Sequence, residues 1–427
     1  MKQLLVLVAL LAAAFGLGQN HNSSRQAQAQ PPAQDPPCGA IDNSGVGAEN
    51  TTGFPQALQK PEDRADVLDL LLAKIWFYYL DPGFEGKDWE KVSAQYKAQA
   101  LQARSERAYY DAMRGLVNEL DGVFLSTTQL EAQSKLSQAR AGLGGIGTLI
   151  SSTDPRDGLT VRWVLPNSPA ARAGIKARDR ILAVNGRDCP STDRIRGPEG
   201  STLTLRVKSP GQPPRDVTVQ RARVNYPETI LEARRLEANP QVGYLWVSEL
   251  GKEQMPAALE KALTELTSGT PLKGLVLDLR GTGGSGMRTM RYLLGHFISG
   301  VKYGFEGPEF YERRNIPARK PDLSQIPLVV LVDRGTTGSA NMSAAILQTR
   351  PNTTLVGEKT GGGNRYYQGH ELPDGSVFFI AQGRFVLPGE KPMESEQVTP
   401  NVLIGQDWLE FAEADDPYIK AALEQLK

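Results

Sequence analysis

The chain has 427 residues and a formal net charge of zero, with 40% hydrophobic and 22% charged residues. That length provides for two or three domains, each with a core of its own. The balanced charge gives no sign of binding to nucleic acid or to an anionic membrane surface. With two cysteines, three histidines and no metal-ligand spacing, the sequence predicts neither a metal site nor a cofactor.

The first residues have the pattern of an export signal. Lys2 precedes an apolar run at residues 4–15, which is of signal-peptide length and too short to span a bilayer comfortably. Ala27-Gln28-Ala29 is a candidate cleavage site, and Gly16-Leu17-Gly18 lies nearer to the apolar run. We therefore expect a signal peptide at residues 1–29 and an exported body, in the periplasm, in the cell envelope or secreted. An uncleaved N-terminal anchor is the alternative.

Residues 30–61 are rich in Gln, Asn, Ser, Pro and Gly, a composition that predicts a disordered linker. Cys38 lies in this linker, and Cys189 lies far along the chain. In an oxidising compartment the two cysteines either form a disulfide or remain as separate thiols, because sequence does not give their separation.

Helical spacing begins at residue 62. Val67, Leu71 and Ile75 share one face of a first helix. A second helix is expected over residues 96–120 and a third up to about residue 141. Residues 62–141 are therefore predicted to form a small helical domain.

Residues 142–224 change character. Short β-type runs alternate with Gly and Pro turns, and one short helix is expected at residues 169–173. The runs occupy residues 159–164, 180–184, 202–207 and 216–220. This pattern predicts a compact β-rich module.

From residue 225 to the C-terminus, strand and helix patterns alternate, which predicts a mainly parallel α/β sheet. Buried strands are expected at residues 274–279 and 328–332, and a helix at residues 339–348. Ligands of such sheets bind beyond the carboxyl ends of the strands. Three glycine-rich corners fall at these ends, at residues 280–286, 335–339 and 360–363.

Two of these corners could carry chemistry. Gly283 and Gly284 can point backbone N–H groups at an oxyanion, although a plain tight turn is the simpler interpretation. Ser339 stands where a helix is expected to begin. It is therefore either an N-cap residue or a nucleophile assisted by the helix dipole.

At these residues the chain resembles the tail-specific, or C-terminal processing, serine peptidases. The resemblance covers residue 62 to the C-terminus and rests on blocks that follow the family's order. The blocks are LDGVFLS at residues 120–126, GGIG at 144–147, SPAARAGIKARDRILAVNG at 168–186, GLVLDLRGTGGSG at 274–286, VVLVDRGTTGSANMSAAIL at 329–347 and TLVGEKTGGG at 354–363.

The resemblance implies an α+β multidomain chain with an N-terminal helical domain, a PDZ domain at residues 142–224 and an α/β core of the ClpP/crotonase-like type. It implies an exported serine-type peptidase that cleaves unfolded or C-terminally tagged proteins. The PDZ domain would bind a substrate's C-terminal carboxylate at Gly144, Gly145, Ile146 and Gly147, with the peptide added as a strand. The helical domain would either pair two copies of the chain or act as a lid.

The chain departs from the family where the resemblance places its catalytic residues. The attacking serine falls on Gly338, one residue before Ser339, and a glutamate of the same block falls on Asn341. The family's lysine base falls on Gly363, and a glutamine four residues later falls on Tyr367.

Two hypotheses remain. In the first, Ser339 attacks and its base is Lys359 or His370. In the second, the peptidase fold has lost its chemistry and serves as a peptide-binding scaffold. A base must come within about 3 Å of the serine oxygen, directly or through one water, so geometry separates the two.

Overall fold

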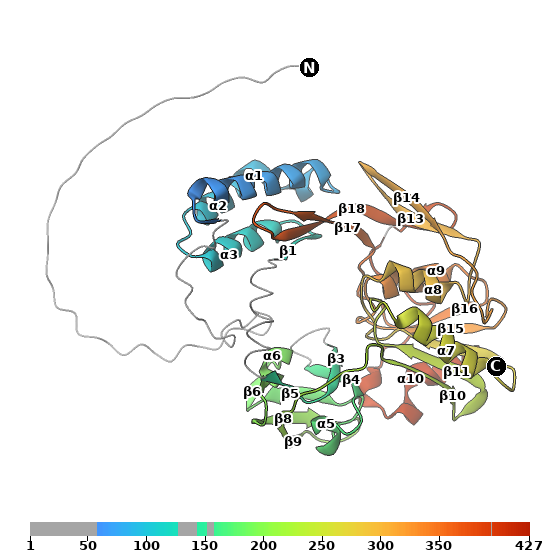
Figure 1. Cartoon of the computed structure of the whole chain (residues 1–427). Coiled ribbons are helices and arrows are strands. Elements are labelled where there is room, and N and C mark those ends of the chain that lie inside the picture. The colour runs from blue at the N-terminus through green and yellow to red at the C-terminus, as the bar shows by residue number, and fades with distance from the viewer. Residues whose placement is uncertain (1–57, 127–142, 152–157, 394) are drawn as a thin grey trace, which may run out of the picture.

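The computed structural model describes residues 58–126, 143–151, 158–393 and 395–427 (Figure 1). The predicted signal peptide, most of the predicted linker and the third predicted helix lie outside the described residues. The chain is a mixed helix and strand protein with a helical N-terminal part, a β-rich module and an α/β core, as the sequence predicts. Of the helices in the described ranges, none combines the length and the apolar character needed to cross a bilayer.

Within residues 58–126, three α-helices build the N-terminal part. They are α1 (Pro61–Tyr78), α2 (Trp89–Leu101) and α3 (Glu106–Val117). The single helix expected over residues 96–120 is therefore wrong. The chain turns between α2 and α3, and Ser105 starts α3 as an N-cap, with its hydroxyl accepting a hydrogen bond from the Ala108 N–H at 3.3 Å.

The β-rich module is an antiparallel sheet with strand order β3-β4-β5-β8-β9. Its strands are β3 (Thr148–Ser151), β4 (Leu159–Val164), β5 (Arg180–Val184), β8 (Thr202–Lys208) and β9 (Arg215–Gln220), and β6 (Arg187–Asp188) pairs with β5. The short strands β2 (Leu143–Gly144) and β7 (Gly197–Pro198) pair with each other, and the helices are α5 (Pro169–Arg172) and α6 (Thr192–Ile195). Strand β3 stands at one edge of this sheet.

The core is built on a six-stranded sheet of order β10-β11-β12-β15-β16-β20. Its strands are β10 (Leu231–Leu236), β11 (Asn239–Val247), β12 (Gly274–Asp278), β15 (Leu328–Val332), β16 (Thr353–Gly357) and β20 (Val402–Leu403). From β11 to β20 all neighbours are parallel, and β10 is antiparallel. The predicted parallel sheet is thus confirmed.

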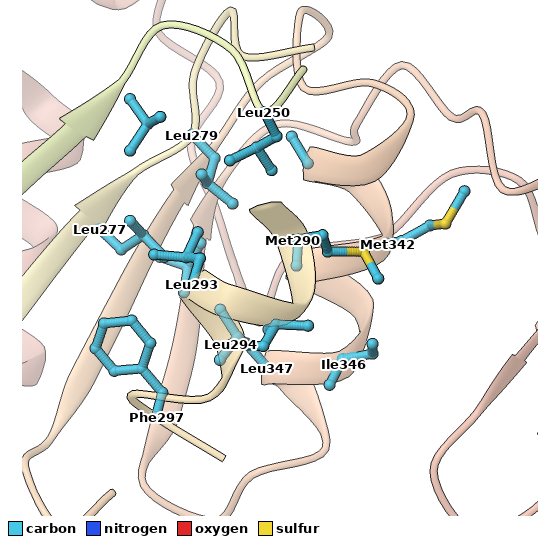
Figure 2. Close-up of a cluster of buried hydrophobic side chains, with 14 of the residues drawn as sticks. Leu250, Leu277, Leu279, Met290, Leu293, Leu294, Phe297, Met342, Ile346 and Leu347 are labelled. Carbon is cyan, nitrogen blue, oxygen red and sulfur yellow. The ribbon is translucent and has the colours of Figure 1, made fainter. Parts of the chain in front are cut away.

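Helices cover both faces of this sheet, because successive side chains of each strand point to opposite sides. On one face lie α7 (Met255–Thr267), α8 (Met287–Leu294) and α9 (Ser339–Gln348). Figure 2 shows Leu277 beside Leu293 of α8, and Leu279, Met290 and Ile346 belong to the same buried cluster. On the other face Val276 and Leu331 pack against α10 (Pro417–Gln425).

A second sheet joins the helical part to the core. It contains β1 (Val123–Ser126), β13 (Lys302–Gly307), β14 (Phe310–Asn315), β17 (Arg365–Glu371), β18 (Val377–Leu387) and β19 (Lys391–Pro392). Its longest strand, β18, is continuous over 11 residues. Figure 1 shows α1, α2 and α3 beside β1, β17 and β18, and Val67 and Phe378 belong to their common core.

A buried ion cluster links the module to the core. Arg280 lies directly after β12 and bonds Asp278 at 2.6 Å and Asp416 at 2.8 Å, with every side chain at most 1% exposed. Asp416 also binds Arg178 of the module at 2.8 Å. Burial raises the pKa of Asp278, but the charge and hydrogen bonds of Arg280 outweigh burial and lower this pKa to about 2.

Cys189 is disulfide-bonded, and the chain's other cysteine, Cys38, lies outside the described residues.

Removing the cation of this cluster should strongly destabilise the fold. We expect Arg280→Met to lower the free energy of unfolding by about 3–5 kcal/mol, because two buried carboxylates each lose a cationic partner. Arg288→Met is the matched control, since the Arg288 side chain is 75% exposed and its ion pair spans 4.0 Å. Urea unfolding of both variants checks this, and equal midpoints would contradict it.

Candidate functional site

Three strand ends of the core sheet meet through their backbones. The Thr337 N–H donates to the Thr282 carbonyl at 3.0 Å, and the Gly338 N–H donates to the Gly362 carbonyl at 2.9 Å. Asp333 adds a side-chain link by accepting the Gly281 N–H at 2.8 Å. The three glycine-rich corners predicted from the sequence are therefore brought together at one edge of the sheet.

Gly338 occupies the sharpest turn of this site. It is the N-cap of α9, with φ 58° and ψ −127°, a conformation that an L side chain adopts only under strain. A strained strand-to-helix turn is also where serine hydrolases of other folds expose their nucleophile. A Cβ at Gly338 would overlap the carbonyl oxygen of Gly284, so the turn as built accepts no side chain.

Gly363 lies directly against this turn. A Cβ added there would come 2.8 Å from the Gly338 nitrogen and 3.1 Å from its Cα. Gly338 and Gly363 are the positions at which the resemblance places serine and lysine. The structure therefore brings these two positions into contact, and both are glycine.

Ser339 is the first residue of α9 and is fully buried. Its backbone N–H and its hydroxyl both donate to the Gly284 carbonyl, each at 2.8 Å. The N-cap interpretation is therefore wrong, because Gly338 is the cap and the serine oxygen bonds across to the neighbouring corner. A hydroxyl that donates to a carbonyl has no base to take its proton in this conformation.

Neither predicted base reaches this hydroxyl. The Lys359 side chain is exposed, and no hydrogen bond or ion pair within the described part of the chain joins it to Ser339. His370 lies on β17, stacked on Tyr78 and Phe378 with ring centroids 5.0 and 5.2 Å away. Burial and the Lys74 charge lower the pKa of His370, which is neutral there at pH 7.

Asn341, at the position of the family's glutamate, is a structural bridge. Its side-chain amide donates to the Glu396 carbonyl at 2.9 Å, and its Oδ1 accepts the Thr360 hydroxyl at 2.6 Å. The Thr360 hydroxyl in turn accepts the Val398 N–H at 2.7 Å. Asn341 thus fixes α9 to the two segments that pack beside it.

Gly283 and Gly284, the predicted oxyanion donors, lie at the site, and both of their carbonyls accept hydrogen bonds. Gly283 accepts the Leu250 N–H at 3.1 Å, and Gly284 accepts both donors of Ser339. Oxygen rather than N–H of Gly284 therefore faces the serine. This oxygen belongs to the Gly284–Ser285 peptide, which would have to turn before it could present an N–H to an oxyanion at the serine.

A cavity of about 720 Å³ lies between the module and the core. On the module side it is lined by Gly144, Gly145, Ile146, Thr148, Ile150, Thr192 and Ile195, and on the core side by Trp246, Ser248, Glu249, Lys252 and Gly281. Glu249 forms a bridge with Gly283, so the cavity extends to the first corner. The predicted peptide-binding loop therefore opens into it, although the Gly145 N–H already donates to the Ala222 carbonyl at 2.9 Å.

Two side chains that the sequence did not single out shape this cavity. Arg162 of β4 lies over the Trp408 ring at 4.6 Å and donates to the Arg280 carbonyl at 2.5 Å, and burial lowers the pKa of its guanidinium. Tyr226 lines the cavity from the connection between the module and β10. Neither residue stands in a recognisable motif. Among the described residues, no cluster of three His, Cys, Asp or Glu side chains could hold a metal ion.

Comparison with known proteins identifies both parts of this site. The profile of peptidase family S41 matches residues 241–404, and that of the PDZ domain matches residues 160–209. A carboxyl-terminal-processing protease of Picosynechococcus sp. is 29% identical over 86% of this chain and 92% of its own length. Another from Synechocystis sp. is 26% identical over 82% of this chain and 83% of its own length.

A solved structure shares the fold. The photosystem II D1 C-terminal processing protease superposes with a TM-score of 0.57 and 23% identity, covering 80% of this chain and 93% of that chain. The names of these relatives support C-terminal processing and give no support to a binding role without catalysis.

A side chain at the turn should cost stability. We expect Gly338→Ala to lower the free energy of unfolding by about 1–3 kcal/mol, because of its backbone conformation and its overlap with Gly284. Gly405→Ala is the matched control, since a Cβ at Gly405 meets nothing within 4 Å. Thermal unfolding of the two variants measures the difference, and a fully stable Gly338→Ala would show that the turn accepts a side chain.

Proposed function

Because the chain belongs to the tail-specific, C-terminal processing peptidase family with a PDZ domain, we propose that it binds the C-terminal tails of unfolded or tagged proteins along the outer edge of β3. The observation that carries this proposal is the position of β3. Among the described strands it pairs with β4 alone, so no described strand occupies its other edge, where a peptide could add as a strand.

The surroundings of β3 suit an extended peptide. Ile150 of β3 and Ile195 of α6 line the same cavity, which offers apolar contacts to alternate side chains of the tail. The glycine-rich loop of residues 144–147 precedes the strand, and a loop of this kind can direct backbone N–H groups at a terminal carboxylate. The apolar residues would then favour tails with apolar side chains, and the loop would favour a free C-terminal carboxylate.

The carboxylate of the tail should carry much of the affinity. We expect a labelled ten-residue peptide ending in Leu-Val with a free carboxylate to bind roughly tenfold or more tightly than the same peptide amidated, because charge-assisted hydrogen bonds are lost. Fluorescence anisotropy with the full chain measures both affinities. Equal binding of the two peptides would exclude a carboxylate-reading loop.

Cleavage of the bound tail is the second candidate function, favoured by the names of the relatives. Ser339 would be the nucleophile, Lys359 its base and Gly283–Gly284 the oxyanion donors. This chemistry needs the Ser339 hydroxyl to leave the Gly284 carbonyl, and it needs a neutral amine brought to within about 3 Å. The contact between Gly338 and Gly363 favours binding without cleavage, because no side chain stands at either position.

Ser339→Ala distinguishes tail binding alone from cleavage of the bound tail. If Ser339 is the nucleophile, Ser339→Ala abolishes hydrolysis of an unfolded protein with an apolar tail, and Lys359→Ala does the same without weakening tail binding. If the corner only binds, the wild type and Ser339→Ala both leave the tail intact. Mass spectrometry of the products reads this out. Equal cleavage by wild type and Ser339→Ala would remove Ser339 from the mechanism.

Export completes the proposal. The apolar run at residues 4–15 and the cleavage candidates that follow it support a signal peptide at residues 1–29. The disulfide of Cys189 supports an oxidising compartment, where structural disulfides persist. The substrates would then be proteins of the periplasm, the cell envelope or the medium.

A further inference from the structure

Tyr226 reaches the edge of β3 from outside the β-rich module's sheet. Tyr226 lies on the connection between β9 and β10, and the residue is 47% exposed. Its hydroxyl donates a hydrogen bond to the Thr148 carbonyl at 3.1 Å. Burial raises the pKa of Tyr226, so the hydroxyl remains a donor at neutral pH.

The Thr148 carbonyl belongs to the outer edge of the strand. The Leu165 N–H, at the end of β4, donates to the Gly147 carbonyl at 2.9 Å, so Gly147 points toward β4. Thr148 lies opposite Val164, and the bond between the flanking residues makes this a non-hydrogen-bonded pair, in which both carbonyls point away from the partner strand. Thr148 therefore presents its carbonyl away from β4, where an added strand would need an acceptor.

We propose that Tyr226 is an internal competitor of the tail, a residue that sets affinity by occupying the first acceptor of the outer edge of β3. This inference rests on the proposed tail binding. An incoming strand donates its own N–H to the Thr148 carbonyl, and the Tyr226 hydroxyl turns out into water. Thr148 is only 8% exposed, so its carbonyl takes its hydrogen bond from Tyr226 or from the tail. The displaced Tyr226 hydroxyl is hydrated instead, so the exchange of the two donors is close to balanced in the wild type.

Removing the hydroxyl therefore favours the tail. Tyr226→Phe leaves the Thr148 carbonyl without its internal donor in the unbound protein, and the tail restores that bond. We expect the labelled peptide ending in Leu-Val to bind Tyr226→Phe roughly two- to twelvefold more tightly than wild type, the range given by one net hydrogen bond. Tyr226→Leu, which also lacks the hydroxyl, should show a gain in the same direction.

Tyr311→Phe is the matched control, because Tyr311 is 71% exposed on β14 and should leave the affinity unchanged. Anisotropy titrations of the full-length proteins give the affinities, and their thermal midpoints check the fold. Equal or weaker binding by Tyr226→Phe, with measurable binding by wild type, would overturn the inference and leave the proposed function standing. Absence of binding in every protein would overturn the proposed function itself.

Discussion

The close backbone contact of three strand-end loops is the constraint on which this site depends. Hydrogen bonds between main-chain groups join the loops after β12, β15 and β16, so no side chain separates them. Glycine stands where the loops touch, at Gly284, Gly338 and Gly363, because a Cβ there would collide with a neighbouring backbone or force a strained φ. The same contact directs the Gly284 carbonyl at Ser339, and thereby decides what the serine hydroxyl does.

This backbone contact has different consequences for peptide binding and for hydrolysis. The proposed tail recognition needs an edge strand, a cavity with some apolar lining and a glycine-rich loop, and all three lie around β3. Hydrolysis needs a nucleophile and a desolvated base, and the resemblance places these two residues at Gly338 and Gly363. Fold and domain order follow from many buried residues, so they tolerate the loss of any few. Catalysis follows from two or three residues, so membership of a peptidase family fixes the fold more firmly than the chemistry.

The sequence predicted correctly those elements in which a buried apolar run ends at a glycine-rich corner. Strands β12 and β15 are continuous apolar runs ended by glycine-rich corners, and α9 follows directly, so their order could be predicted. The sequence did not predict the elements that depend on contacts between distant parts of the chain or on a single capping residue. Strand β17 is largely exposed and reads as polar, and the break before α3 depends on one capping serine. The partner of the Ser339 hydroxyl could not be predicted either, since Gly284 is 55 residues away in sequence.

A shared buried carboxylate links the module to the core, and the cavity lies between these two parts. Arg178 of the module and Arg280 of the core bind the same buried oxygen of Asp416. Their side chains are 14% and 1% exposed, so salt screens this linkage far less than a surface ion pair. Arg280 also leads into the corner whose Gly284 holds Ser339. One carboxylate therefore helps to hold the module against the core and binds the arginine that leads into the loop facing the serine.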